Sequence, residues 1–239
     1  MNSNQKKLLF VAGAVVVAGV AISSQRGNMS KPIQAVKPVV PIQPITQSTF
    51  TICLDPGHGT GASNVGATNA CTGVLERTEV LRAALILEKF LLARGFKVFL
   101  TRRTDDAPGL PGYDLNTRVS MAENAKADLL LSLHFDMWQA HKVTGKPVCS
   151  GGNPGRGAGI LYNAKAGLAV ASGLAKALDV VTPGGVYTEL RDSKTLYLTR
   201  FSKPMLLVEI DRVQRLSEAD LTSRMNAISN FLWNWYLSE

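Results

Sequence analysis

The sequence predicts an α/β fold: a single domain built on a twisted, mostly parallel sheet flanked by helices. Short apolar runs of strand character alternate along the chain with segments whose apolar residues recur at helical spacing, which is typical of parallel sheets. The chain has 239 residues, of which 46% are hydrophobic. One domain with a substantial core is therefore expected, together with an N-terminal extension.

The first predicted strand, residues 50–54, runs directly into the sequence Asp55-Pro-Gly-His-Gly59. Proline fixes one backbone angle and glycine permits unusual ones, so the chain is expected to turn sharply where the strand stops. The turn places His58 at the end of the sheet, where ligands usually bind in open α/β folds. A second apolar strand, residues 129–133, ends in the same way at His134.

The rest of the domain continues this alternation. After a polar loop at residues 60–73, apolar positions from Val80 onward predict a helix that Gly95 ends. Residues 140–157 are rich in glycine and proline without periodicity, and they predict a long surface loop. Ser217, with Asp220 three residues later, predicts the N-cap of the last helix. Further strands are expected at residues 97–101, 159–162, 195–198 and 205–209, and further helices at residues 115–126 and 166–178.

Two basic residues, Lys6 and Lys7, precede an uncharged and mostly apolar stretch at residues 8–22. Residues 1–22 are expected to be either a signal peptide with a small-x-small cleavage site, or a short signal-anchor that forms a transmembrane helix. The lysines place the N-terminus on the cytoplasmic side in both cases. Both interpretations predict an exported domain, either anchored at the membrane in the periplasm or cell envelope (or on a phage particle), or secreted.

Residues 23–48 form a predicted Pro-rich linker, which would be extended and semi-stiff and would precede a domain at residues 49–239. Residues 1–49 hold five basic residues and no acid. The chain has 26 basic and 18 acidic residues. Residues 50–239 therefore hold 21 basic and all 18 acidic residues, a net charge of +3. This distribution favours contact of the N-terminal segment with an anionic membrane, and it argues against a nucleic-acid-binding face on the domain.

The three cysteines show no C-x-x-C spacing, which argues against a thiolate zinc site. Cys53 falls in the first strand and is expected to be an inert core residue. Cys71 and Cys149 fall in predicted loops, where an exported protein would join them in a disulfide. Two free thiols are the alternative.

Two histidines at strand ends suggest a metal site. Catalytic zinc usually takes three protein ligands from histidine and carboxylate side chains and keeps one open position. His58 and His134 supply two ligands, and Glu76, at the start of the first helix, is the best candidate for the third. The alternative is two structural histidines in turns and a first-turn acid that stabilises the helix dipole.

Glu209 ends an apolar strand and is expected to emerge at the same edge of the sheet. A carboxylate beside an activated water can take its proton and pass it to a leaving nitrogen, so Glu209 is the candidate general base. The alternative is an ordinary strand-end acid paired with Arg212 or Lys203. Asp55 is expected either to orient His58 or simply to make the turn.

These residues resemble the zinc-dependent N-acetylmuramoyl-L-alanine amidases of the amidase 3 type, in register from about residue 51 to the C-terminus. Each motif alone is weak, but the combination is specific. The motifs are Asp55-Pro-Gly-His-Gly59, Gly73-Val-Leu-Glu-Arg77, Leu100-Thr-Arg102, Arg118 with Ala122-Glu-Asn124, Ala127-Asp-Leu with Ser132-Leu-His134, and Pro204-Met-Leu-Leu-Val-Glu209.

The resemblance implies that His58, Glu76 and His134 bind Zn²⁺ and that Glu209 is catalytic. It also implies cleavage of the peptidoglycan amide between the lactyl group of muramic acid and L-alanine, by a bacterial or phage-encoded enzyme. Two segments depart from the family pattern. Phe135-Asp136 stands where the family usually has Ala-Asn, and Ile210-Asp-Arg-Val213 replaces a segment with glycine, phenylalanine and asparagine. A zinc peptidase acting within the stem peptide, or a non-catalytic wall-binding module, are the competing interpretations.

Overall fold

The computed structural model describes residues 48–59, 66–105, 115–136, 138–143, 146–154, 157–182, 184–192 and 194–239. The predicted signal or anchor segment and all of the linker except Ser48 lie outside these residues. Among the residues that the structure describes, no helix combines the length and the apolar character needed to cross a membrane.

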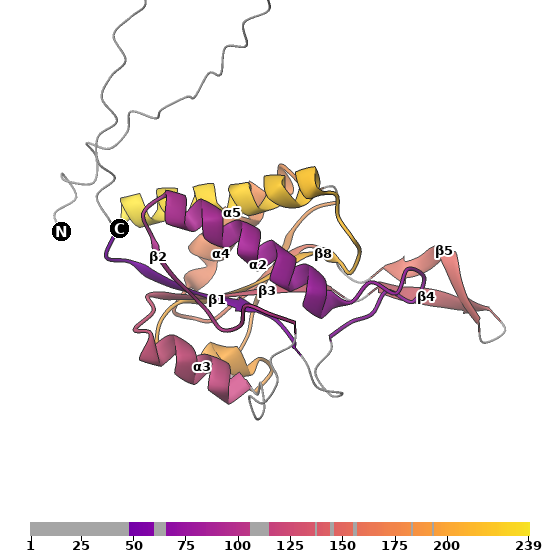
Figure 1. Cartoon of the computed structure of the whole chain (residues 1–239), viewed down its shortest axis with the longest axis horizontal. Coiled ribbons are helices and arrows are strands. Elements are labelled where there is room, and N and C mark those ends of the chain that lie inside the picture. Colours follow the sequence, from indigo (N-terminus) through magenta and orange to yellow (C-terminus); the bar gives the residue numbers. More distant parts are fainter. Residues whose placement is uncertain are drawn as a thin grey trace, which may run out of the picture. The chain divides into compact units, whose positions relative to one another are not determined.

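The domain is built on a six-stranded sheet with the order β2-β1-β3-β8-β6-β7 (Figure 1). The strands are β1 (Thr51–Pro56), β2 (Lys97–Leu100), β3 (Leu129–Asp136), β6 (Gly159–Tyr162), β7 (Tyr187–Leu190) and β8 (Met205–Arg212). Every neighbouring pair is parallel except β6 and β8, which run antiparallel. The predicted α/β fold with a mostly parallel sheet is therefore confirmed.

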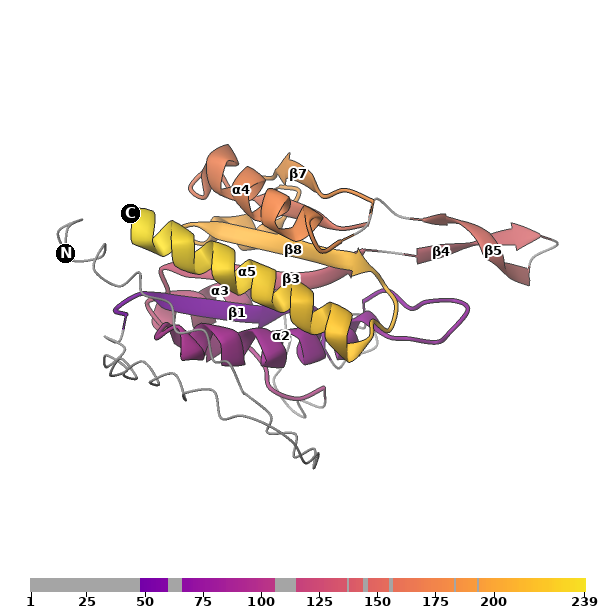
Figure 2. The ribbon, with the colours of Figure 1, turned by 90° about the horizontal axis from the view of Figure 1, so that it is seen from above.

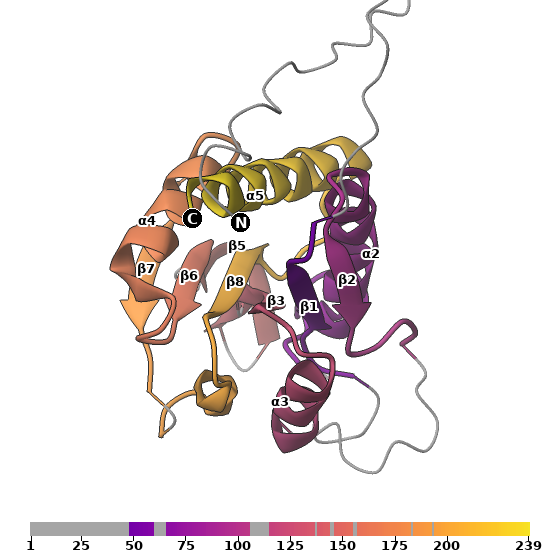
Figure 3. The same ribbon diagram turned by 90° about the vertical axis from the view of Figure 1, so that its left-hand side faces the viewer.

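Helices cover both faces of this sheet, as Figure 3 shows. On one face lie α2 (Glu76–Ala93), α4 (Gly167–Asp179) and α5 (Glu218–Ser238); on the other lie α3 (Leu115–Asn124) and the short 3₁₀ helix η2 (Tyr197–Arg200). The larger core fills the space beneath α2, α4 and α5, and a smaller one lies beneath α3 and η2. The predicted cap of α5 is present, because the Ser217 side chain accepts a hydrogen bond from the Asp220 amide at 3.0 Å.

The register of the central strands determines which side chains meet at the edge. β1, β3 and β8 are mutually parallel in this order, so their carboxyl ends lie together. Side chains alternate between the two faces of a strand. Leu130 of β3 and Leu207 of β8 belong to the core beneath α3, so His134 and Glu209 lie on that same face. His134 and Glu209 are also direct Cα partners in the sheet.

The prediction of a long surface loop at residues 140–157 was wrong. The chain instead forms a two-stranded antiparallel ribbon of β4 (Trp138–Val143) and β5 (Lys146–Pro154), which extends beyond the carboxyl ends of the central strands (Figure 2). Backbone groups make the ladder of such a ribbon, so it forms without the alternation of apolar and polar residues that marks a half-buried strand. The ribbon continues directly from β3, only four residues after His134.

A second error concerns the edge of the sheet. Strand character was predicted at residues 195–198, but η2 begins there, and the edge strand is β7 instead. β7 is only four residues long and none of its residues is buried, so its sequence lacks the apolar run of a central strand.

The cysteines divide into two classes. Cys53 is a free thiol with no exposed surface, and burial raises its pKa, as expected for an inert core residue. Cys71 is disulfide-bonded, which decides between the two states predicted for it. The remaining cysteine of the chain, Cys149, lies in β5.

Candidate metal centre

The turn after β1 is held by two buried arginines from distant parts of the chain. Arg102, which follows β2, donates from Nε to the Pro56 carbonyl at 2.9 Å and from Nη2 to the Gly57 carbonyl at 2.8 Å. Arg118 of α3 donates to the Pro56 carbonyl at 3.0 Å and to the His58 carbonyl at 2.6 Å. His58 adopts a φ of 60°, in the left-handed region that non-glycine residues rarely occupy. The two guanidinium groups therefore fix a strained turn that aims the imidazole.

Asp55 anchors the same turn rather than the ring of His58. Its Oδ1 accepts hydrogen bonds from Arg118 and, at 2.7 Å, from the Thr101 hydroxyl, and its Oδ2 accepts from the Ser132 hydroxyl at 2.7 Å. Burial alone would raise the pKa of Asp55, but the Arg118 charge and these hydrogen bonds outweigh burial and hold the pKa below its ordinary value. The turn-making role is the one of its two predicted roles that the geometry supports.

Glu76 is the first residue of α2, and only 3% of its surface is exposed. Its Oε2 accepts from the Ala67 amide at 2.7 Å, and its Oε1 accepts from the Phe135 amide at 3.0 Å. A carboxylate that served only the helix dipole would face solvent near the first turn. Glu76 instead points inward and joins the loop before α2 to the end of β3.

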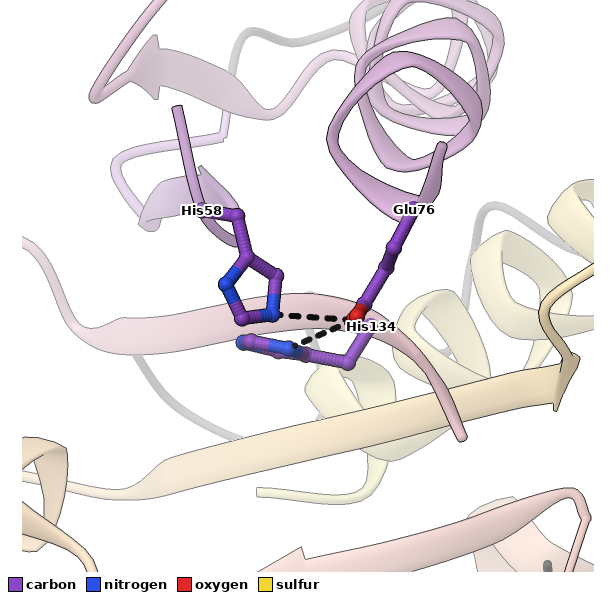
Figure 4. A group of neighbouring side chains, drawn as sticks. All are labelled: His58, Glu76 and His134. Atoms are coloured by element: carbon purple, nitrogen blue, oxygen red, sulfur yellow. Dashed lines mark hydrogen bonds and ion pairs between the residues drawn. The ribbon is translucent and has the colours of Figure 1, made fainter. Parts of the chain in front are cut away.

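Both predicted histidines meet this carboxylate (Figure 4). His58 Nε2 lies 3.0 Å and His134 Nδ1 lies 3.1 Å from Glu76 Oε1, and the two ring centroids are 4.8 Å apart. One ligand atom from each of the three residues falls within 4.8 Å of the other two. Burial would raise the pKa of Glu76, but hydrogen bonds and charge from His134 and His58 lower it strongly, so the carboxylate is ionised at neutral pH.

Two glycines leave the room that this cluster needs. A Cβ added to Gly57 would lie 2.3 Å from His134 Cε1, and one added to Gly66 would lie 2.6 Å from His58 Cδ2 and 2.8 Å from Glu76 Oε2. Gly66 also has a φ of +73°, a backbone conformation that favours glycine independently of the space around it. Three oxygen and nitrogen donors in such a fitted space match the donor set of a three-ligand metal site.

Glu209 lies beside the cluster on β8, as the direct partner of His134 in the sheet. Its Oε2 is buried and has no hydrogen-bond partner among the described residues. Burial first, and then the charges of Glu76 and Asp136, raise its pKa well above the ordinary value. A strand-end acid paired with Lys203 is not what the structure shows, because Lys203 pairs with Asp128 at 2.9 Å at the opposite end of β3.

Sequence reasoning gave no role to Arg102 and Arg118, although both stand in the motifs that carry the family resemblance. Each has only 1% of its side-chain surface exposed, and each acts on backbone carbonyls of the turn. An arginine just after a predicted strand and another within a helix are the only signals in the sequence. Neither signal says which carbonyls the guanidinium groups reach.

Comparison with known proteins points to one family. The family described as N-acetylmuramoyl-L-alanine amidase, Amidase_3, matches residues 52–230. The germination-specific N-acetylmuramoyl-L-alanine amidase of Bacillus subtilis (strain 168) is 33% identical over 105 residues, which are 39% of this chain and 42% of that protein. The chain thus spans less than half the length of this curated relative.

Solved structures share the fold at lower identity. An N-acetylmuramoyl-L-alanine amidase from Clostridium difficile 630 superposes with a TM-score of 0.63 at 19% identity, covering 80% of this chain and 98% of that one. The N-acetylmuramyl-L-alanine amidase Ami1 from Mycobacterium smegmatis gives 0.61 at 19% identity, covering 80% and 99%. These similarities concern the fold, whereas the match over residues 52–230 extends through the turn, the cluster and Glu209. The chain therefore belongs to the Amidase_3 family of N-acetylmuramoyl-L-alanine amidases.

Proposed function

We propose that the protein hydrolyses the amide bond between N-acetylmuramic acid and L-alanine in peptidoglycan, with zinc held by His58, Glu76 and His134. The observation that carries the proposal is the convergence of these three side chains on one point, beside a buried carboxyl group, in a chain of the Amidase_3 family. Two neutral imidazoles and one carboxylate are a frequent ligand set for catalytic zinc.

Zinc bound there would lower the pKa of a water molecule and polarise the carbonyl of the scissile amide. The protein supplies the rest. Phe135 and Ala67 hold the two oxygens of Glu76 through their amides, which fixes the carboxylate against rotation. Arg102 and Arg118 fix the backbone on which His58 stands. The cluster is thus positioned before a ligand arrives, which favours catalysis.

Glu209 would move the proton. A carboxyl group whose pKa is raised well above its ordinary value is suited both to take a proton from the attacking water and to release it to the departing L-alanine nitrogen. The position of Glu209 on β8, across from His134, keeps it outside the three-residue cluster. It is therefore free to serve as an acid–base group rather than as a ligand.

The location of the activity is part of the proposal. Residues 1–22 would direct export and either be removed or stay in the membrane, the linker at residues 23–48 would separate membrane and domain, and residues 49–239 would be the catalytic domain. The basic, acid-free composition of residues 1–49 supports this arrangement, because it suits an anionic membrane surface.

Product analysis tests the reaction. The full chain, loaded with zinc, is incubated with purified peptidoglycan, and the products are examined by mass spectrometry and by labelling of new amino termini. The proposal expects new N-terminal L-alanine together with a free lactyl carboxyl group on muramic acid, and it expects a chelator to abolish both. New termini elsewhere in the stem peptide would identify a peptidase instead. Binding to peptidoglycan without any new terminus would identify a wall-binding module.

A further inference from the structure

The end of β8 contains a β-bulge next to the metal centre. Glu209 pairs with His134, but the next pair in the register joins Arg212 to Asp136, so β8 uses one residue more than β3 over this interval. A bulge adds one residue to one strand, and thereby changes which side chain lies on which face. Without it, Asp211 would stand opposite Asp136.

The bulge turns Asp211 away from the site. The Asp211 carboxylate accepts a hydrogen bond from Arg224, a nearly buried residue of α5, which packs on the other face of the sheet. Ile210 also belongs to the core beneath α2 and α5. Arg212 consequently occupies the face that holds Asp136, and Asp136 is two residues from His134 on β3.

Gly157 confirms where the Arg212 guanidinium lies. A Cβ built on Gly157 would be 3.7 Å from Arg212 Cζ and Nη2, and the Gly157 amide donates to Asp136 Oδ2 at 2.9 Å. Arg212 and Asp136 therefore converge on the same glycine. Arg212 as a whole is partly exposed. Asp136 follows His134 by two residues on β3, so this corner borders the metal centre.

We propose that Arg212 forms a carboxylate-binding subsite, which recognises an acidic group of the stem peptide on the residue after L-alanine. The inference rests on the proposed function, and it identifies the part of the substrate that Arg212 would bind. Guanidinium offers several N–H donors in a planar fork that matches a carboxylate, and it retains donors even when a protein group engages some of them.

The spacing agrees with this assignment. Two residues along a strand span about 7 Å, which separates the level of His134 from that of Asp136 and Arg212. In the substrate, L-alanine and the residue after it together also span about 7 Å when the peptide is extended. A peptide whose first amide lies at the metal centre and which runs outward along the strand direction would thus bring the next residue to Arg212. Asp136 would weaken the attraction, because its negative charge repels the same carboxylate.

A matched pair of substrates tests the subsite. Two muramoyl peptides are prepared that differ only in carrying a carboxylate or a carboxamide on the residue after L-alanine. We expect the unaltered protein to prefer the carboxylate in kcat/KM by about tenfold, as one charge-assisted hydrogen bond would give. Arg212→Gln should reduce this ratio to about one, whereas Asp136→Asn should increase it. Arg200→Gln is the control, because it removes an exposed arginine from η2, before the other end of β8.

The two variants are expected to change the ratio of kcat/KM for the acid and the amide in opposite directions. This distinguishes recognition of the substrate carboxylate from a purely structural role. If Arg212 and Asp136 only braced the base of the β4–β5 ribbon, both substitutions would slow the two substrates equally, and the subsite would be refuted. A ratio near one in the unaltered protein, or an unchanged ratio in Arg212→Gln, would also refute it. Calorimetric binding of the two uncleaved stem peptides gives the same comparison independently of turnover. Preferential binding of the acid without cleavage would overturn the proposed function and retain the subsite.

Discussion

Replacement of Arg118 by methionine tests how strongly the site depends on the buried ion pair beneath it. Both Arg118 and Asp55 have 1% of their side-chain surface exposed, and Arg118 also donates to the carbonyls of Pro56 and His58. Methionine preserves the unbranched shape and the helix propensity but removes every donor. Asp55 would keep only the Thr101 and Ser132 hydroxyls as partners for its buried charge.

Removing one partner of a buried ion pair typically costs about 3–5 kcal/mol, because the remaining charge stays buried. We expect Arg118→Met to lower the free energy of unfolding by an amount in this range at pH 7. Natural domains have about 5–15 kcal/mol in total, so the variant would be marginal but foldable. The turn carrying His58 would also lose a support, and zinc affinity should fall with it.

The contribution of Asp55 to the free energy of unfolding should change with pH in opposite directions in the unaltered protein and in Arg118→Met. In the unaltered protein the pKa of Asp55 is below its unfolded value of about 3.9, so its contribution is fully present above that pH and is lost as the pH falls through the lower, folded pKa. Without Arg118, burial becomes the dominant effect and raises the pKa. Protonation then relieves the buried charge, so the stability difference between variant and unaltered protein should shrink as the pH falls from 7 to 4.

Urea unfolding followed by circular dichroism, at several pH values, measures both quantities. Arg200→Met serves as the control, because Arg200 is exposed on η2 and contacts the Tyr197 ring at 4.0 Å, whereas Arg118 pairs with buried Asp55. A loss below about 1 kcal/mol for Arg118→Met, the level of an exposed ion pair, would contradict the reasoning. A stability difference that grows on acidification would contradict it as well.

Three further predictions concern the proposed mechanism. His58→Ala and His134→Ala should each lose both bound zinc and peptidoglycan cleavage, and wild-type zinc stoichiometry in either variant would refute the ligand assignment. Glu209→Gln should retain zinc but lose about 10²- to 10⁴-fold in turnover, measured as zinc content and rate on one sample; loss of both together would make it a ligand. Deletion of residues 1–30 should leave an active protein in the cytoplasm, which cell fractionation and a cleavage assay would detect; an insoluble product would instead assign those residues to the fold.

The sequence predicted the central strands and the gathering of His58, Glu76 and His134 because both follow from local patterns. A buried parallel strand is a continuous apolar run, and a polar residue that ends it must emerge at the edge. The start of a helix that packs back on the sheet returns to that same edge, which brought Glu76 there. The prediction needed only the order of elements, and the structure places the three side chains within 4.8 Å.

The ribbon of β4 and β5 and the edge strand β7 could not be predicted on that basis. Both lie at the periphery of the domain, so neither needs the continuous apolar run that marks a buried central strand. The roles of Arg102 and Arg118 were missed for a related reason. They bind main-chain carbonyls, and every residue presents a carbonyl, so residue types alone do not identify the partner.

The bulge in β8 shows how much one residue changes at such an edge. Strict alternation from Glu209 would place Asp211 on the face of the metal centre, next to Asp136, and would add a second carboxylate beside an already crowded set of acids. The inserted position moves Asp211 to Arg224 and presents Arg212 in its place. The sign of the charge at this corner therefore depends on strand register rather than on composition. Any assignment of a charge to this corner must therefore follow the register of β8, because Asp211 and Arg212 carry opposite charges.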